Sequence, residues 1–477
     1  MAISYKEGEK KVRPGLYQRQ ENVDLNNNIT ARDGICAIPV KASWGPLGKV
    51  LKNNSKLDLK NNYGDGEYSA NYTVPAAAEM FNGGASSVYT YRMGTGGTAA
   101  SKEFTTGLTA TAKYPGDVSI SVAVQTKLAD SSKKEFLVYF GNSLVESIDF
   151  KADTTAEGQN LIDAVAKESK YVTVTVTPEG SAPATVPVVA VAGGALTGGV
   201  DPTVQNEDYS KAFAALEPYY YNAIALDVDD DASTTKSLLL QSYIENSAEL
   251  GKYCVGVVGE KVSVDFEDRL AHCRAFNSEK VVYLGGGYMA GTNNCDGALA
   301  LCRTAGYIAS TPSNQSIVHK VIDGATELCE TLTNAQYEEA INSGMLVLSM
   351  DADGSIWYDS GVNTLTVLDE KTQDEGWKKI KRTKVRYEAF DRIDRTLAPK
   401  VGKVNPLSDG IADIIQSAQR ILDAMVSENK LYTGASFVQD PDRPVDADSA
   451  WFIIDAVDVD TLEKIYLTYR FHYSQNQ

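Results

Sequence analysis

The stretch between Tyr253 and Gly287 decides the fold class. It contains YCVGVVG at 253–259, VDFEDRLAHCRA at 264–275 and KVVYL at 280–284. The first and third pieces are short apolar runs that predict strands, and the middle piece predicts a helix. The alternation continues outward, with helices expected at 208–216, 234–247, 295–304, 316–322 and 334–342 and strands at 223–228 and 345–350. Such alternation predicts an α/β layer with a largely parallel sheet.

The composition changes between residues 93 and 199, where Gly, Ala, Thr, Val and Ser dominate. Strands are expected at 107–112, 118–126, 134–140, 171–177 and 186–191, with one helix at 156–166. Short strands with turn residues between them favour a β-sandwich or small barrel. We interpret this block as a domain inserted into the α/β layer.

The region after residue 350 mixes elements. We expect short strands at 356–358 and 364–368, a basic strand at 378–386, and a helix at 409–429 with Ser408 as its N-cap. The chain closes with strands at 451–459 and 463–473. In the last of these, Ile465, Leu467, Tyr469 and Phe471 lie on one face because side chains alternate along a strand.

These patterns predict a multidomain α+β fold with four parts. Residues 1–25 form an N-terminal arm that joins the C-terminal domain. Residues 26–92 and 200–350 form a discontinuous α/β core domain, and residues 93–199 form the inserted, β-rich outer domain. Residues 351–477 form a C-terminal inner α+β domain, which ends in an arm strand at 464–473.

Charge and length exclude several classes of protein. The 477 residues carry 45 Lys and Arg against 63 Asp and Glu, a formal net charge of -18. A dedicated nucleic-acid binder needs a basic face, so direct nucleic-acid binding is not expected. No apolar run approaches the roughly 18 residues of a membrane helix, and residues 1–15 lack an apolar signal region. The six cysteines are therefore expected to be reduced thiols.

Motifs for catalysis or metal binding are weak. The spacing of two histidines and four cysteines invites a zinc site but matches no usual pattern, so buried thiols are favoured. These residues are His272, Cys273, Cys295, Cys302, His319 and Cys329. No metal or cofactor is predicted. The sequence also lacks GxSxG, HExxH and any Ser/His/Asp set with supporting spacing.

Three further motifs have ordinary alternatives. Gly285–Gly287 follows a strand and could cradle a phosphate, but a plain turn is favoured. Asp351, Asp353 and Ser355 resemble the start of a calcium loop that lacks the Gly and Glu it needs, so a turn is favoured. The acidic run 227–231 could bind a cation, but a solvated acidic loop is favoured.

Several segments, in order over more than 400 residues, resemble the contractile tail sheath proteins of bacteriophages and phage-derived tails. The first are RPGLY at 13–17, LTATAKYPGDVSISV at 108–122 and the stretch from Leu196 to Glu217. The others are SGVNTL at 360–365, the basic run 377–386 followed by RYEAFDRIDR, and VGKVNPLSDG at 401–410. Each segment alone is a weak signal, and their shared order carries the resemblance.

The resemblance implies a structural subunit without a catalytic site. Sheath subunits stack as hexameric rings in a helical tube around an inner tail tube, and contraction drives that tube through a bacterial envelope. The implied partners are further copies of the chain, the inner tube protein, and the baseplate and tail terminator proteins. Neither nucleic acid nor membrane insertion is implied. The implied location is the tail of a virion or phage-like particle, assembled in the cytoplasm of a bacterial host.

The resemblance also suggests roles for particular residues. Arm strands that pair with neighbouring subunits would include Tyr5, Val12, Leu16, Tyr17, Ile465, Leu467, Tyr469 and Phe471. Charge contacts between subunits would join Lys378, Lys379, Lys381, Arg382, Lys384 and Arg386 to Asp440, Asp442, Asp446 and Asp448. The helix 409–429 would face the tube through Asp413, Gln416, Arg420 and Asp423.

The alternatives to these roles stay open from the sequence. Both arms could pack within their own subunit, and the basic run could be a solvated charged strand. At the level of the whole protein, the alternatives are an α/β hydrolase-like enzyme with a β-domain insertion and a non-contractile surface or shell protein.

Overall fold

The computed structural model describes residues 3–4, 17–18, 29–153, 155–177, 188, 191–229, 235–369 and 371–471. The chain divides into two compact units. The smaller unit comprises residues 1–31 and 389–457, and the larger one comprises residues 32–388 and 458–477. The division therefore begins the smaller unit at 389, where the sequence suggested a domain starting at 351. It also assigns residues 458–477 to the larger unit.

A seven-stranded sheet lies at the centre of the larger unit, in the order β19-β15-β14-β13-β3-β5-β4. Its strands are β3 (Ile35–Val40), β4 (Val50–Asn53), β5 (Ser87–Arg92), β13 (Ala223–Ala225), β14 (Val255–Gly259), β15 (Val281–Leu284) and β19 (Met345–Leu346). Every neighbouring pair is parallel except β4 with β5. The prediction of a largely parallel α/β layer is confirmed.

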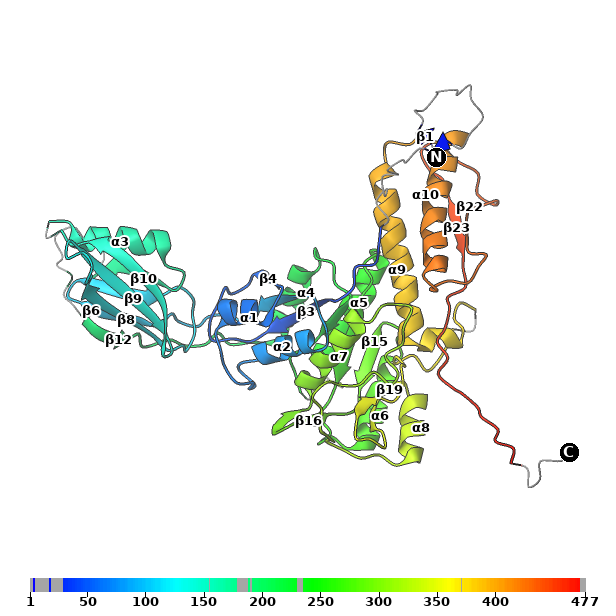
Figure 1. The fold of residues 1–477 in the computed structure, drawn as a ribbon, viewed down its shortest axis with the longest axis horizontal. Helices are drawn as coiled ribbons and strands as arrows, with labels where there is room; N and C mark the ends of the chain where they lie inside the picture. Colours follow the sequence, from blue (N-terminus) through cyan, green and yellow to red (C-terminus); the bar gives the residue numbers. More distant parts are fainter. Residues whose placement is uncertain are drawn as a thin grey trace. The chain divides into compact units, whose positions relative to one another are not determined.

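Helices cover both faces of this sheet (Figure 1). One layer consists of α1 (Lys56–Tyr63), α2 (Val74–Asn82) and α7 (Ala298–Ser310), and the other of α4 (Asn206–Leu216), α5 (Thr235–Glu249), α6 (Phe266–Phe276) and α8 (Asn334–Asn342). The two-residue period of a strand divides the core between these layers. In β14, Val255 and Val257 belong to the first layer and Val258 to the second.

Two glycines let α2 and α7 approach closely. A Cβ at Gly306 would lie 2.2 Å from the carbonyl oxygen of Met80, and one at Gly83 would lie 2.3 Å from that of Arg303. Both obstacles are backbone atoms, which cannot rotate away as a side chain can. The two helices must therefore move apart to accept any larger residue at either position.

Gly306→Ala is therefore expected to destabilise the larger unit by about 3 kcal/mol, since overpacked cores lose roughly 1–3 kcal/mol. The midpoint of urea unfolding, followed by circular dichroism, measures the effect. Gly286→Ala is the matched control, because a Cβ there meets its nearest atom at 3.6 Å. Equal midpoints for the two variants would show that the α2–α7 packing is not tight.

The inserted domain forms two antiparallel sheets, in the orders β10-β9-β8-β12 and β11-β7-β6. Its elements are β6 (Ser101–Thr105), β7 (Leu108–Ala112), β8 (Ile120–Thr126), β9 (Lys133–Phe140), β10 (Ser143–Lys151), α3 (Glu157–Glu168), β11 (Val172–Val176) and β12 (Val191–Ala195). Inward side chains from both sheets make one core. The predicted β-rich insertion is confirmed as a sandwich, although the sequence reading missed β6 and β10.

Short elements complete the larger unit. These are β16 (Tyr288–Ala290), β17 (Asn293–Cys295), β18 (Glu327–Leu328), β20 (Leu348–Met350) and β21 (Ile356–Tyr358). The turn predicted at Asp351 joins β20 to β21. The carboxylate of Asp351 accepts hydrogen bonds from the backbone N–H groups of Asp353 and Ser355. Two predictions are wrong: residues 316–322 form turns rather than a helix, and residues 364–368 form no strand.

The smaller unit contains α10 (Ser408–Ser427) and a hairpin of β22 (Ser436–Gln439) and β23 (Phe452–Asp455). The buried face of α10 includes Ile411, Ala418, Leu422 and Met425, at the spacing that predicted the helix. Leu407 occupies the N-cap without a side-chain hydrogen bond, so Ser408 is the first helical residue and not the cap. The segment predicted as a strand at 451–459 pairs only at β23.

Candidate assembly surfaces

The basic run lies on a helix, which corrects the predicted strand. Glu375–Lys378 form a 3-10 turn (η2), and α9 follows from Ile380 to Leu397. Lys and Arg favour helices, and the run has no alternation of apolar and polar residues that a half-buried strand would show. Lys381, Arg382, Lys384 and Arg386 consequently point in different directions around α9, while Lys378 and Lys379 precede it.

An acidic segment of the same chain pairs with this helix. Arg382 donates two hydrogen bonds to the carboxylate of Asp458, at 2.5 and 2.8 Å, and Arg386 lies 3.4 Å from the same group. Lys379 pairs with Asp460 at 2.6 Å and with Glu463 at 3.0 Å. We call residues 458–463 the anchor segment. The sequence reading missed all three of its acids.

The surroundings of the anchor segment favour the ionised form of its aspartate side chains. Burial alone would raise the pKa of the Asp458 carboxyl, but the hydrogen bonds from Arg382 and the charge of Arg386 outweigh it and lower that pKa. The pKa of Asp460 is also lowered, because the hydrogen bond from Lys379 outweighs burial. Asp458 is only 8% exposed. A bidentate pair at such a site is a strong interaction.

The basic side chains that do not pair with the anchor segment contact other parts of the larger unit or are buried in it. Lys378 pairs with Glu375, and Lys384 donates to the carbonyl oxygens of Ile308 and Thr311. Lys381 is buried, and its ammonium has no hydrogen-bond partner among the described residues. Burial lowers the pKa of this ammonium. Lys381 and Lys384 are therefore covered within their own chain.

The acids predicted to meet this cluster lie in the smaller unit. Asp440 accepts the backbone N–H of Asp442 and lies 3.6 Å from Arg443. Asp442, Asp446 and Asp448 are exposed in the loop between β22 and β23. Contacts between these acids and the basic helix of another copy stay a prediction.

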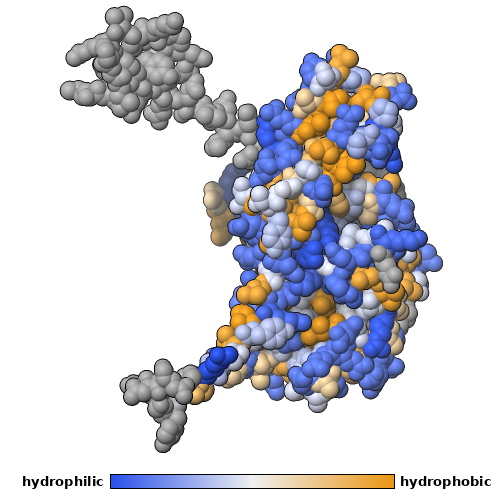
Figure 2. All heavy atoms as spheres, turned by 90° about the vertical axis from the view of Figure 1, so that its right-hand side faces the viewer, coloured by the Kyte–Doolittle hydropathy of each residue, from blue (hydrophilic) through white to orange (hydrophobic). Residues whose placement is uncertain are grey.

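The end of the chain is extended and exposed. Residues 463–471 form no strand within the described part of the chain, which corrects the assignment of a strand to 464–473. A strand exists only when a second strand supplies its hydrogen-bond partners. Phe471 is 92% exposed and Tyr469 74%, and Ile465 and Leu467 are exposed as well. Figure 2 shows apolar side chains along this segment beside the grey end of the chain.

The hairpin of the smaller unit also exposes apolar side chains. Val438 and Ile453 face each other across β22 and β23, and both are more than 40% exposed, as is Ile454. Among the described residues, neither strand pairs with a third one. The backbone N–H of Phe437 in β22 donates to the side chain of Gln419 at 2.9 Å, and the edge of β23 is open to another strand.

The N-terminal arm is described only in part. Ile3–Ser4 (β1) pairs in parallel with Tyr17–Gln18 (β2), and this places Tyr17 in a short strand. Tyr5, Val12 and Leu16 lie outside the described residues. Arg395 donates to the carbonyl oxygen of Thr30 at 2.6 Å, a contact within the smaller unit.

The helix predicted to face a tube has an exposed stripe. Gln416, Arg420 and Asp423 are exposed on α10 and lie on one side of it, since they are four and three residues apart. Asp413 is half-buried and pairs with Lys400 at 2.6 Å. Asp423 accepts a hydrogen bond from Gln419 at 2.9 Å, and the exposed stripe of Gln416, Arg420 and Asp423 faces away from the buried side of α10.

The acidic loop expected to be solvated is partly a buried structural site. Asp227 follows β13, and its carboxylate accepts hydrogen bonds from Thr73 and Tyr209, each at 2.7 Å, with Lys41 at 3.3 Å. Asp229 accepts the hydroxyl of Tyr68 at 2.8 Å. The prediction of a solvated loop is wrong for these two residues, and residues 230–231 lie outside the described part.

The cysteines and histidines make no cluster that could hold a metal within the described residues. Five of the six thiols are buried, and burial raises the pKa of Cys36 and Cys254 to about 12. His272 pairs with Glu260, and His319 stacks on Trp357. No described helix is long and apolar enough to span a membrane.

The described residues thus combine an α/β core, an inserted β-sandwich and an exposed apolar segment at 464–471. Profiles of the phage tail sheath protein central domain and of the phage tail sheath protein beta-sandwich domain match residues 203–363 and 95–201. Together they cover more than half of the chain. The chain belongs to the phage tail sheath family, whose members form contractile tails.

Two curated relatives come from Bacillus subtilis. The uncharacterised protein YqbK is 26% identical over 376 residues, which are 76% of this chain and 74% of YqbK. The phage-like element PBSX protein XkdK is 26% identical over 388 residues, which are 79% of this chain and 78% of XkdK.

Solved structures share the fold. A sheath tail protein from Listeria innocua superposes with a TM-score of 0.69 at 20% identity, covering 91% of this chain and 96% of its own. One from Desulfitobacterium hafniense gives 0.70 at 19% identity, with 90% and 97% covered. The PVC sheath complex in the contracted state, from an extracellular contractile injection system, gives 0.54 at 9% identity, with 98% and 99% covered.

Proposed function

We propose that the chain polymerises as stacked hexameric rings around an inner tail tube and contracts to drive that tube through a bacterial envelope. The observation that carries the proposal is the exposed segment 464–471, whose apolar side chains are uncovered and which pairs with no strand among the described residues. A soluble protein seldom leaves such a strand uncovered unless another chain covers it.

The acceptor that fits this segment is the β22–β23 hairpin of a second copy. Strand addition supplies main-chain hydrogen bonds along the open edge, and alternating side chains supply specificity. In the segment, Ile465, Leu467 and Tyr469 share one face, which matches the apolar Val438 and Ile453. The N-terminal arm is proposed to add to the same network of subunits.

The anchor segment gives this exchange a fixed starting point. Lys379 and Arg382 hold residues 458–463 on the larger unit, and the arm begins directly after them. The described residues 464–471 alone can span about 26–29 Å, at roughly 3.3–3.6 Å per residue. Subunits joined in this way would stay linked while their contacts rearrange during contraction.

The proposed partners beyond the chain itself are the inner tube, the baseplate and the tail terminator. The proposed location is the tail of a virion or phage-like particle, assembled in a bacterial cytoplasm. A catalytic role is not proposed, because in the described part no serine hydroxyl or cysteine thiol hydrogen-bonds the ring of His272 or His319. Energy for contraction would then come from contacts between subunits in a two-state array.

Electron microscopy of the purified, full-length protein tests this function. Long hollow tubes with six-fold symmetry are expected. Monodisperse particles at every salt and protein concentration, together with turnover of ester or amide substrates, would instead support the hydrolase alternative.

The exposed stripe of α10 is the proposed contact with the tube. Arg420→Glu is expected to leave self-assembly intact while it weakens co-sedimentation with purified tube protein by at least about tenfold, because charge reversal makes attraction into repulsion. Lys133→Glu, at an exposed lysine of the β-sandwich, is the control. Equal co-sedimentation of the two variants would exclude this stripe as the tube contact.

A further inference from the structure

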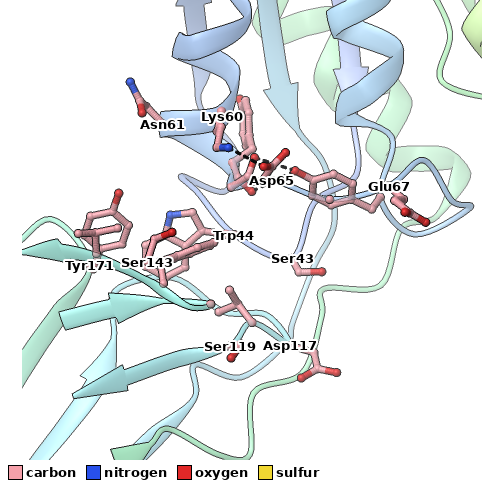
Figure 3. Close-up of a pocket in the computed structure, with 18 residues that line it drawn as sticks. Ser43, Trp44, Lys60, Asn61, Asp65, Glu67, Asp117, Ser119, Ser143 and Tyr171 are labelled. Atoms are coloured by element: carbon pink, nitrogen blue, oxygen red, sulfur yellow. Dashed lines mark hydrogen bonds and ion pairs between the residues drawn. The ribbon is translucent and has the colours of Figure 1, made fainter. Parts of the chain in front are cut away.

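A hollow of about 580 Å³ lies within the larger unit, where the β-sandwich meets the α/β core. Figure 3 shows its lining, which comes from residues 43–72 of the core and from residues 117–171 of the sandwich. Its volume falls within the roughly 300–1,000 Å³ that small-molecule sites occupy.

Trp44 forms one wall of the hollow and is only 3% exposed. Its ring stacks on Tyr171 at 5.6 Å between centroids and meets Tyr114 and Phe140 edge to face, at 5.0 and 5.7 Å. The indole nitrogen points toward the open space between Tyr171 and Asn61 (Figure 3). Among the described residues, none accepts a hydrogen bond from it.

The indole N–H has no hydrogen-bond partner among the described residues, and its nitrogen is not enclosed by protein, so it can donate to a group that enters the hollow. The aromatic packing accounts for the faces of Trp44 but not for its polar edge. A ligand or a water in the hollow can therefore supply the acceptor. Since the N–H only donates, a cation is a poor occupant at this wall.

The opposite rim carries acceptors. Asp65, Glu67 and Asp117 are exposed carboxylates that line the hollow, and among the described residues only Asp65 has a basic partner, Lys60 at 2.5 Å. This charge disfavours an anion. Ser119 and Ser143 add hydroxyls, which both donate and accept. A ligand hydroxyl can accept a hydrogen bond from the indole N–H and donate one to a carboxylate. A neutral polyol therefore matches both sides of the hollow.

Aromatic side chains fit the other face of such a ligand. Tyr72, Phe140 and Tyr171 line the hollow and offer apolar surface to the C–H face of a sugar ring. The cavity is also preformed by close backbone packing. Gly116 has φ of +151°, and a Cβ there would lie 1.7 Å from the carbonyl oxygen of Ser43; at Gly64, a Cβ would lie 2.9 Å from Phe140. Preformed sites lose little entropy on binding.

We propose that this hollow is a binding site for a neutral saccharide. The indole N–H of Trp44 would donate to a sugar oxygen, and the carboxylates of Asp65, Glu67 and Asp117 would accept from its hydroxyls. All residues that line the site lie between residues 43 and 171 of the larger unit.

Isothermal titration and saturation-transfer NMR on the full-length protein test the site. The probes are three soluble trisaccharides: N-acetylglucosamine trimer, which is neutral, glucosamine trimer, which is cationic, and galacturonic acid trimer, which is anionic. Binding of the neutral trimer with a millimolar or tighter Kd is expected, with weaker binding of both charged trimers. Trp44→Phe keeps an aromatic ring but removes the donor, so it should weaken binding roughly 3- to 10-fold.

A second variant keeps the test decisive if Trp44→Phe fails to fold. Ser143 is exposed at the mouth of the hollow, so Ser143→Phe fills the space without touching a core. This variant should abolish binding and still form sheath tubes. Absence of binding up to 20 mM of the neutral trimer, preferential binding of either charged trimer, or unchanged affinity in Ser143→Phe would each overturn the proposal.

Discussion

A chain that ends at Glu463 is expected to fold normally but to lose polymerisation. Residues 464–471 are exposed and belong to no sheet in the described part of the chain, so their removal takes nothing from either unit. An added strand of this length would form on the order of five main-chain hydrogen bonds at about 1 kcal/mol each. Their loss should raise the critical concentration for assembly by more than about a thousandfold.

Sedimentation and electron microscopy measure this effect, with thermal unfolding as the check on folding. The matched pair of full-length variants separates the two faces of the arm. Serine at Ile465, Leu467, Tyr469 and Phe471 should abolish tubes, whereas Thr468→Ser with Arg470→Lys should retain them. Tubes formed by the shortened chain would show that the arm packs within its own subunit.

The variant Arg382→Glu is expected to release the anchor segment. It removes the bidentate partner of Asp458, a nearly buried carboxylate, and places a second negative charge beside it. Breaking a buried pair by removing one partner costs about 3–5 kcal/mol. We expect hydrogen exchange in residues 458–463 to accelerate about a hundredfold or more, and the released arm to assemble poorly.

Two comparisons make this prediction specific. The swap Arg382→Asp with Asp458→Arg should restore part of the protection, because the pair re-forms with reversed charges. Arg443→Glu should change exchange at the anchor little, since its pair with Asp440 has an exposed arginine and a 3.6 Å separation. Unchanged exchange in Arg382→Glu would show that the anchor is held by other contacts.

The sequence predicts local elements well wherever periodicity is strong. The helix at 334–342 and the strand at 356–358 appear with the predicted bounds, because their alternate or helically spaced apolar residues face the core. The basic run was assigned wrongly to a strand because it lacks such a periodicity. It carries few apolar residues, so it has no period that separates helix from strand, and tertiary packing decides.

Pairing across long sequence separations could not be derived. Asp458 lies 76 residues from Arg382, and nothing local joins them. Complementary charge was the one signal in the sequence that could have indicated this pairing. Three acids, at Asp458, Asp460 and Glu463, immediately precede the arm and lie close enough in the sequence to meet one basic surface together. The proposed saccharide site is harder still to predict, because Trp44 and Tyr171 are 127 residues apart in the sequence and meet only in the folded chain.

The alternation at 464–473 was readable, but its partner was not. Period-two spacing shows that one face of the segment is suited to burial, and the described chain offers no sheet that pairs with it. The surface that covers Ile465, Leu467, Tyr469 and Phe471 therefore has to be identified in the assembled protein.

A photo-crosslinking residue at Tyr469 in the full-length protein answers it most directly. Illumination of assembled protein should give a ladder of covalent oligomers, with mass spectrometry placing the crosslinks in β22 or β23 of another copy. A monomer band alone, with crosslinks confined to the same chain, would contradict the exchange of arms between subunits.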